Sequence, residues 1–466
     1  MNVNDTDITT SILSKSGYKI VDNENGADII LLMTCAIREN AELKVWGKLK
    51  ELSNAKKRGN IKKFGLLGCM AERLKTNVLD QLPTIDVIAG PDTYRALPKL
   101  LAINNLTGQN AVNVLLSLDE TYDDIFPQFD INKPPTSSFV SITRGCNNMC
   151  SYCIVPFTRG RERSRKMETI LNEVKHHISN GVKEITLLGQ NVNSYRDLSE
   201  SELSSNDTKI KLAEGFKTIY KLKKGGIGFE TLLDNVAQID PNVRIRFTSP
   251  HPKDFNDEVI KVIAKHSNIA KGLHMPAQSG SNLVLERMRR GYTKEAYIQL
   301  VDRIRKDIPD CAINSDFICG FCDENESDHL ETLDLVEKVG YHVAYIFAYS
   351  MREKTHAYHH LNDNVPQDVK ISRLKELGDT YRKVLLKLNQ KALNTNQLIL
   401  VEGVSKKSKS ELYGRNEAHQ KVIIPATKRK TTFKPGDYLN VLITGCTPVT
   451  LIGDPVEKTT ITQFYS

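Results

Sequence analysis

The chain has 466 residues, of which 40% are hydrophobic and 26% are charged, a balance typical of a folded protein of about three domains. The net charge is +8, no apolar run approaches the ~18 residues of a membrane span, and the start lacks the features of a signal or transit peptide. Nine cysteines without a secretory signal exclude a disulfide scaffold, so we expect a reducing compartment and cysteines used for metal or catalysis.

The first part of the chain alternates apolar runs with helix-favouring sequence, which predicts a parallel α/β sheet over residues 1–126. The expected strands are Ile29–Met33, Phe64–Leu67 and Val87-Ile88. Cys35 and Cys69 each follow one of these strands, at the edge where such sheets place their ligand-binding loops.

A second α/β alternation predicts a full or partial parallel barrel within residues 136–390. The six expected strands are Phe139–Thr143, Glu184–Leu188, Arg244–Thr248, Gly272–Met275, Cys311–Ile318 and His342–Ala348. The Ser-, Lys- and Gly-rich stretch 199–228 is expected to be a surface insertion. Asp368 is expected to cap a long helix, and residues 391–466 to form a small all-β module. Its expected strands are Leu398–Val401, Val422–Ile424, Tyr438–Ile443 and Thr450–Ile452.

The positive charge is concentrated in two tracts. Arg159 to Lys166 carries five basic residues and one acid, and residues 395–466 carry ten basic residues and six acids. Each tract therefore has a net charge of +4, and together they account for the whole excess. They are either solvated surface or two patches that contact a phosphate backbone.

Three cysteines, Cys146, Cys150 and Cys153, stand at i, i+4 and i+7 on the loop after the first barrel strand. Thiolates are the usual ligands of iron–sulfur clusters, and a 4Fe–4S cluster needs four. Three thiolates from one loop leave one iron open, the mark of a catalytic rather than a structural site. A zinc knuckle is the alternative, but no histidine lies nearby.

The pattern C-x-x-x-C-x-aromatic-C at the end of a first barrel strand resembles the radical S-adenosylmethionine enzymes. By this resemblance the open iron binds S-adenosylmethionine and cleaves it to a 5′-deoxyadenosyl radical. Tyr152, the aromatic residue of the motif, is then expected beside the adenine of the cofactor.

Further motifs narrow the resemblance to the methylthiotransferases, in particular the tRNA-modifying branch that makes 2-methylthio-N6-isopentenyladenosine. They are Val155–Arg165, Leu188–Tyr195, Ser249–Pro252, Leu273–Ser281 and Tyr349–Arg352. Arg159–Arg165 and Val87–Tyr94 look most like the eukaryotic, mitochondrial members. The resemblance implies an N-terminal domain with a second cluster, a radical barrel and a C-terminal TRAM β-barrel that grips tRNA.

The implied activity is insertion of a methylthio group at C2 of an N6-isopentenyl adenosine adjacent to the anticodon. The implied partners are tRNA and a flavodoxin- or ferredoxin-type electron donor, with no membrane. One alternative is a methylthiotransferase for threonylcarbamoyl-adenosine tRNA, and a more distant one modifies an aspartate of a ribosomal protein. A third is a non-catalytic RNA-binding or regulatory homologue, if Met1 is the true start.

The resemblance also implies site residues beyond the three cysteines. Cofactor-binding roles fall on Gln190, Asn191, Gln278 and Ser279, which follow barrel strands. Expected RNA contacts are Arg159, Arg161, Arg163, Arg415, Lys428, Arg429 and Lys430. The Gly414–His419 stretch departs from the usual TRAM motif, and Cys319 and Cys322 form a C-x-x-C pair that we interpret as a chance pair of thiols.

The second cluster of the family takes three thiolates, of which Cys35 and Cys69 match two. The third belongs to a Gly-Cys-Gln-Met-Asn motif whose Met-Asn aligns with Met1-Asn2, so the cysteine is expected two residues upstream of Met1. We therefore expect an incomplete auxiliary site and a missing first strand. A transit peptide would also lie upstream, which leaves mitochondrial and cytoplasmic locations open.

Overall fold

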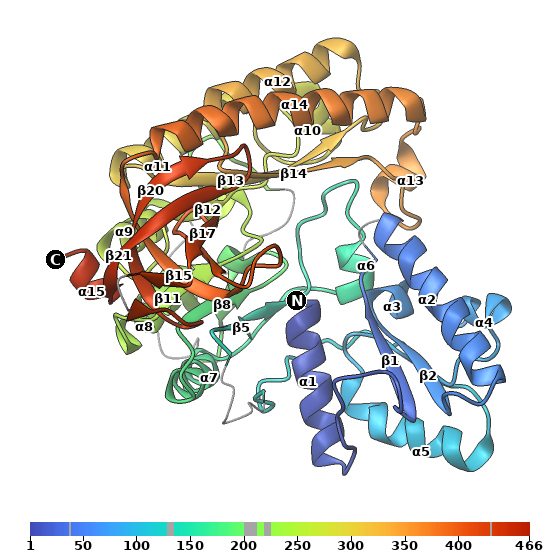
Figure 1. The fold of residues 1–466 in the computed structure, drawn as a ribbon. Coiled ribbons are helices and arrows are strands. Elements are labelled where there is room, and N and C mark those ends of the chain that lie inside the picture. Colours follow the sequence, from blue (N-terminus) through green and yellow to red (C-terminus); the bar gives the residue numbers. More distant parts are fainter. Residues whose placement is uncertain (37–38, 128–134, 200–211, 219–224, 429–430) are drawn as a thin grey trace.

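The computed structural model describes residues 1–36, 39–127, 135–199, 212–218, 225–428 and 431–466, arranged as three α/β or β units (Figure 1). The N-terminal unit lies on one side of the central barrel, and the C-terminal β module lies against the barrel on the other side (Figure 1). Within the described residues, no helix is long and apolar enough to cross a membrane.

The N-terminal unit is a four-stranded parallel sheet covered on both faces. Its strands, in pairing order, are β1 (Ile29–Thr34), β2 (Lys63–Gly68), β3 (Val87–Ala89) and β4 (Ala111–Asn113). One face packs on α1 (Asn2–Lys15) and α5 (Leu97–Thr107). The other face packs on α2 (Glu39–Lys57), α3 (Cys69–Leu74) and α4 (Asn77–Gln81). The three predicted strands are present, and the sheet has the expected α/β character.

The central unit is a partial barrel of six parallel strands that follow one another in sequence order. They are β5 (Ser137–Ser141), β8 (Glu184–Leu188), β11 (Arg244–Phe247), β12 (Gly272–His274), β13 (Ala312–Cys319) and β14 (Val343–Ala348). Two three-stranded sheets are joined by a parallel bridge between Ile245 and Ile269. One large core fills the space between the strands and the surrounding helices. Those helices are α7 (Met167–Ser179), α8 (Phe229–Ile239), α9 (Asp257–Lys265), α11 (Lys294–Asp307), α12 (Glu326–Val339) and α14 (Gln367–Lys391). All six predicted strands are therefore confirmed to within two residues.

The C-terminal unit is a closed five-stranded barrel. Its strands, in barrel order, are β15 (Asn396–Val404), β16 (Glu411–Arg415), β17 (Lys421–Pro425), β21 (Leu451–Thr459) and β20 (Tyr438–Cys446). The sequence analysis did not predict β16, because its short run contains a glycine and charged ends.

Two local predictions are wrong. The residue that caps α14 is Pro366, and Asp368 lies inside the first turn, because proline supplies a φ angle suited to a helix start. The stretch 199–228 is not simply a surface insertion: Ala213 and Phe216 are buried in the barrel core, and β10 (Ile227–Gly228) pairs with β9 (Arg196–Asp197). Much of its Ser- and Lys-rich part lies outside the described residues.

Candidate active site

The cysteine loop begins at a long β-hairpin, whose two short antiparallel strands are β6 (Thr143–Arg144) and β7 (Arg163–Ser164). Gly145 follows β6 with a φ of +76°, and a Cβ there would collide with the backbone carbonyl of Arg161. Only glycine fits this position without moving the hairpin. The turn therefore fixes where the chain enters Cys146.

The three thiols of this loop lie close enough to influence one another. Burial, followed by the neighbouring Cys153 and Cys150, raises the pKa of the Cys146 thiol well above its usual value. Burial and Cys150 raise the pKa of Cys153 to about 12. Three thiolates at this place therefore require a cationic group to bind, which is the chemistry of a metal site.

The donor set fits an iron–sulfur cluster better than a single ion. Among the described residues, no three His, Cys, Asp or Glu side chains are close enough to hold one metal ion. In a 4Fe–4S cluster each thiolate binds a different iron, so the sulfurs stand further apart. The backbone N–H of Asn148 donates a hydrogen bond to the Cys146 sulfur at 3.4 Å, which further suits an anionic sulfur.

The turn after α10 (Asn282–Arg287) supports the loop from behind. The Ser151 N–H donates to the Met288 carbonyl at 3.0 Å, and the Ser151 hydroxyl donates to the Arg287 carbonyl at 2.7 Å. From this turn the Arg290 guanidinium donates a hydrogen bond to the Cys150 sulfur at 3.4 Å. The sequence analysis missed Arg290, because nothing in its local pattern distinguishes it from the exposed Arg289 beside it.

The four predicted cofactor-binding residues other than Tyr152 lie in different local settings. Both amide atoms of Gln190 are buried and have no hydrogen-bond partner among the described residues, which fits a polar ligand. Asn191 is engaged: its amide donates to Asp254 at 3.0 Å and its oxygen accepts from the His251 N–H.

Ser279 and Gln278 are held by the protein itself. The Ser279 hydroxyl lies 3.2 Å from the Thr332 hydroxyl. The Gln278 N–H donates to the carbonyl of Asp316, and its φ is +71°. Tyr152 packs edge-on against Phe321, with ring centroids 6.4 Å apart. The cofactor roles of all five residues stay predictions.

The second cysteine pair lies beside the cysteine loop rather than elsewhere on the molecule. Cys35 follows β1, and Cys69 opens α3 at the end of the neighbouring β2. Ala36, Cys69 and Ile154 form one buried cluster, and Ile154 directly follows Cys153. The two cysteine sites therefore face each other across the junction of the N-terminal unit and the barrel.

Arg159, on α6 (Val155–Arg159), ties the two sites together. Its Nε donates to the Cys69 sulfur at 3.0 Å, and its Nη2 donates to Asp5 at 2.5 Å. Asp5 also accepts from Arg144 at 3.0 Å. Burial alone would raise the pKa of Asp5, but the charges of Arg159 and Arg144 outweigh it and lower that pKa.

Two of the predicted RNA contacts lie inside the protein. Arg159 and Arg163 are buried, and Arg163 pairs with Asp92 at 3.0 Å. Arg165 is likewise buried against Glu173. The first basic tract is thus largely internal, because three of its arginines pair with the buried carboxylates of Asp5, Asp92 and Glu173. Arg161 is exposed and stays a predicted contact.

The second basic tract divides differently. Arg415 is partly buried, pairs with Glu402 at 3.2 Å and donates to the His419 carbonyl. Lys428 is partly exposed beside Asp454, at 3.0 Å. Arg429 and Lys430 lie outside the described residues. The roles of these four residues stay predictions, although Arg415 is already engaged within the protein.

The turn between β16 and β17 enters the end of the barrel opposite the cysteine loop. Arg246 donates to the carbonyls of Asn416 and Glu417 and to Glu184 at 2.8 Å. Arg244, fully buried, donates to the Arg415 carbonyl at 3.1 Å. All of these contacts involve the starts of barrel strands, so the β module closes the amino-terminal mouth of the barrel.

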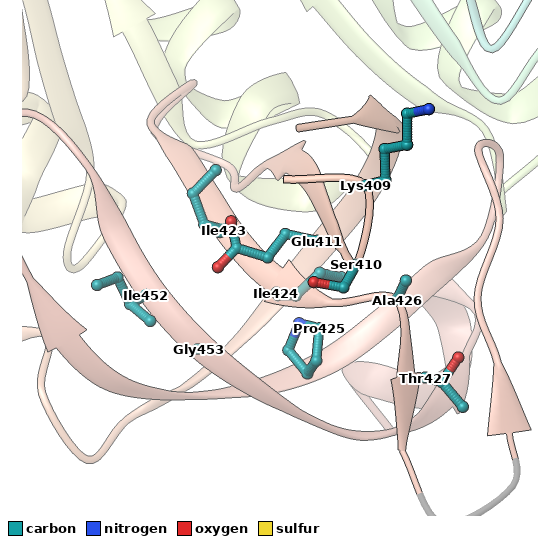
Figure 2. A pocket seen from close by; sticks show the side chains of 10 residues that line it. All are labelled: Lys409, Ser410, Glu411, Ile423, Ile424, Pro425, Ala426, Thr427, Ile452 and Gly453. Carbon is teal, nitrogen blue, oxygen red and sulfur yellow. The ribbon is translucent and has the colours of Figure 1, made fainter. Parts of the chain in front are cut away.

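The β module also carries a surface pocket of about 580 Å³ between β16, β17 and β21 (Figure 2). Its floor is mainly apolar, with Ile424, Pro425 and Ile452 among the lining residues. Glu411 points into the hollow and the Lys409 side chain extends away from it at the rim (Figure 2). An apolar floor with a carboxylate acceptor suits a flat ring with amino groups.

The chain matches three known families along its length. Residues 140–336 match the radical SAM superfamily, residues 1–90 match the uncharacterized protein family UPF0004, and residues 390–456 match the TRAM domain. These ranges cover most of the barrel, most of the N-terminal sheet and most of the closed β-barrel.

Curated relatives match nearly the whole chain. The mitochondrial tRNA methylthiotransferase CDK5RAP1 of Rattus norvegicus is 53% identical over 99% of this chain and 80% of that protein. The CDK5RAP1-like protein of Oryza sativa is 48% identical over 100% of this chain and 81% of that protein. The tRNA-2-methylthio-N(6)-dimethylallyladenosine synthase of Chloroherpeton thalassium is 44% identical over 97% of this chain and 93% of that protein. The cysteine loop, the order of the domains and these identities agree. The chain therefore belongs to the tRNA methylthiotransferase family of radical SAM enzymes.

Proposed function

We propose that this chain is a tRNA methylthiotransferase that inserts a methylthio group at C2 of an N6-isopentenyl adenosine adjacent to the anticodon. The observation that carries the proposal is the meeting of two cysteine sites across Ile154, with Arg159 bonded to the Cys69 sulfur. A radical generated at one site and a sulfur held at the other can then act on the same base. The names of the relatives support tRNA as the substrate.

In this proposal Cys146, Cys150 and Cys153 hold a 4Fe–4S cluster and leave its fourth iron to S-adenosylmethionine. When bound there, S-adenosylmethionine supplies a 5′-deoxyadenosyl radical after one-electron reduction. The chain's own part is to hold the reactants in place. The unpartnered amide of Gln190 is suited to bind the polar part of the cofactor, and Tyr152 is suited to pack beside its adenine.

Cys35 and Cys69 are two of the three thiolates that the auxiliary cluster of the family takes. The amino group of Met1 lies near Cys35, Asp5 and Arg159, each of which shifts its pKa in addition to burial. Residues 1–466 offer this site two matching thiolates, Cys35 and Cys69, and we expect them to bind the radical cluster but to hold the auxiliary one poorly.

Iron and sulfide analysis after anaerobic reconstitution tests this expectation. About four irons per chain are expected from the three-cysteine loop. Close to eight irons per chain would contradict it.

The TRAM module is proposed to bind tRNA. The pocket between β16, β17 and β21 and the partly exposed Lys428 are the described features of the module that support this role. The exposed Arg161 of the cysteine loop is proposed as a further contact. An unpaired base can stack on the apolar floor, while phosphates bind the surrounding basic side chains. The mitochondrial names of the animal relatives support a mitochondrial location, and a low-potential flavodoxin- or ferredoxin-type protein is the proposed reductant.

Mass spectrometry of tRNA nucleosides from a strain without this gene tests the function. Loss of 2-methylthio-isopentenyladenosine, with accumulation of isopentenyladenosine, is expected. Loss of the methylthio form of threonylcarbamoyl-adenosine instead would assign the alternative substrate. Unchanged nucleosides would favour a non-catalytic RNA-binding protein.

A further inference from the structure

Arg290 occupies a tight turn that both supports and contacts the cysteine loop. The turn runs from the end of α10 to the start of α11, and Gly291 within it has a φ of +73°. A Cβ at Gly291 would collide with the carbonyl of Lys217, so the backbone at Lys217 packs tightly against this turn. The carbonyls of this turn hold Ser151, one residue from Cys150. The loop and the guanidinium are therefore positioned by the same few residues.

The guanidinium of Arg290 is held on three sides. Its Nη1 donates to the Cys150 sulfur at 3.4 Å, its Nη2 donates to the Pro276 carbonyl at 2.8 Å, and its Nε donates to the Tyr292 hydroxyl at 3.0 Å. The Tyr292 ring lies against it, 5.3 Å from the guanidinium carbon to the ring centroid. Because every edge is engaged, the donor that faces Cys150 has little freedom to turn elsewhere.

Arg290 has no carboxylate partner among the described residues, unlike the other buried arginines. Eight arginines are buried in the described part of the chain, and seven of them pair with a carboxylate. The seven are Arg144, Arg159, Arg163, Arg165, Arg244, Arg246 and Arg373. Arg290 is 5% exposed, and no carboxylate of the described residues lies within ion-pair distance of it.

A buried charge requires a counter-charge. The sulfur of Cys150 is the one potential anion that the Arg290 guanidinium meets among its hydrogen-bond partners in the described structure. A thiolate bound to iron carries negative charge, and one-electron reduction of a cluster adds more. Hydrogen bonds to the sulfurs are among the factors that set the reduction potential of such clusters.

We propose that Arg290 is a positioning residue of the radical site, which stabilises the one-electron-reduced cluster through its hydrogen bond and charge at the Cys150 sulfur. The electron comes from an external one-electron donor of the ferredoxin or flavodoxin class. Arg290 gains and loses no electron or proton, and no covalent bond changes at it. The inference rests on the radical cluster of the proposed function, but not on the identity of the RNA substrate.

The test is a redox titration of the reconstituted full chain followed by electron paramagnetic resonance, reading the signal that changes when S-adenosylmethionine is added. Arg290→Met is expected to lower the equilibrium constant for one-electron reduction at least tenfold, which is 59 mV for a one-electron couple. Arg290→Lys keeps the charge but not the planar fork, so a smaller loss is expected. Arg289→Met is the matched control, because Arg289 is the exposed neighbour in the same turn.

Iron content and thermal unfolding are measured on each variant. Equal potentials for Arg290→Met and the unsubstituted chain, at equal iron content, would overturn the proposal. The proposal would also be overturned if both Arg290 variants fold but bind no iron at the three-cysteine loop. The role of Arg290 would then be only to support the structure of that loop. If Arg290→Met does not fold, the potential of Arg290→Lys decides: a value below that of Arg289→Met supports the proposal, and an equal value refutes it. No RNA is present, so failure of the tRNA assay is a separate result.

Discussion

Replacing Glu184 by glutamine tests how the TRAM module is attached to the barrel. Glu184 is buried between Arg246, at 2.8 Å, and Arg244, at 3.7 Å. Burial alone would raise the pKa of Glu184, but the two guanidinium charges outweigh it and lower that pKa. Glu184→Gln keeps the shape and removes the charge, which leaves both guanidinium groups with backbone carbonyls as acceptors.

Removing one partner of a buried ion pair costs about 3–5 kcal/mol. Because glutamine can still accept a hydrogen bond from Arg246, we expect a loss near the lower limit, about 3 kcal/mol. Because Glu184 and both arginines lie on barrel strands, this loss sets an upper limit of about a hundredfold on the shift in the docking equilibrium of the module. Hydrogen exchange of the Asn416 and His419 amides reports it, since the turn that carries them is held in the barrel mouth.

Asp234→Asn is the matched control for Glu184→Gln. Asp234 lies near the surface, 25% exposed, and pairs with Lys265 at 2.8 Å and with His266 at 2.7 Å. Exposed pairs contribute less than about 1 kcal/mol, so little change is expected. If the two variants exchange equally fast in the 416–419 turn, the buried ion pair does not hold the module and the reasoning is refuted.

Three further predictions concern other features of the chain. Burial, followed by Arg246 and Arg415, lowers the pKa of His419 to about 3, so the undocked module binds one more proton below pH 6.5. The free energy of docking should therefore weaken by up to about 1.4 kcal/mol between pH 6.5 and 5.5. Hydrogen exchange of the module measures this pH dependence, which His419→Gln should lose. The same pH dependence in His419→Gln would contradict the prediction. Arg161→Gln should weaken tRNA binding and reduce its salt slope by about one with folding intact, whereas Arg163→Gln should lower the melting temperature; equal salt slopes for Arg161→Gln and the unsubstituted chain would refute the contact. Gly145→Ala should abolish iron binding at the three-cysteine loop. Gly108 has a similar φ of +67° but open space for a Cβ, so Gly108→Ala should cost about 1–2 kcal/mol of stability and bind iron normally. Iron analysis and thermal melts separate the two variants.

The sequence predicted the barrel and its cysteine loop because both depend on local patterns. Alternating apolar and helical segments identify parallel strands, and the spacing of Cys146, Cys150 and Cys153 identifies the ligand type. Strand β16 was missed because Gly414 and its charged ends hide a short strand. The barrel closes through the pairing of β15 with β20 and of β17 with β21, which lie far apart in the sequence, so a local pattern does not contain this pairing.

The basic tracts were harder to interpret because the sequence does not show which carboxylate each arginine pairs with in the folded protein. Arg159 and Arg163 alternate with Arg161 in sequence, yet two are buried on Asp5 and Asp92 and the third is exposed. These partners are supplied by the N-terminal unit, far away along the chain. Arg290 escaped notice for the same reason, since its contact with Cys150 exists only in the folded protein.

The central claim is most directly tested by complementing a gene-deletion strain and measuring 2-methylthio-isopentenyladenosine in its tRNA. The full-length gene is expected to restore the nucleoside, and the gene carrying Cys150→Ala is expected to leave it absent, because the three-thiolate site is then incomplete. Cys446→Ala, a partly buried cysteine of the β module, is the control and should restore it fully. Restoration of the nucleoside by Cys150→Ala would contradict the account.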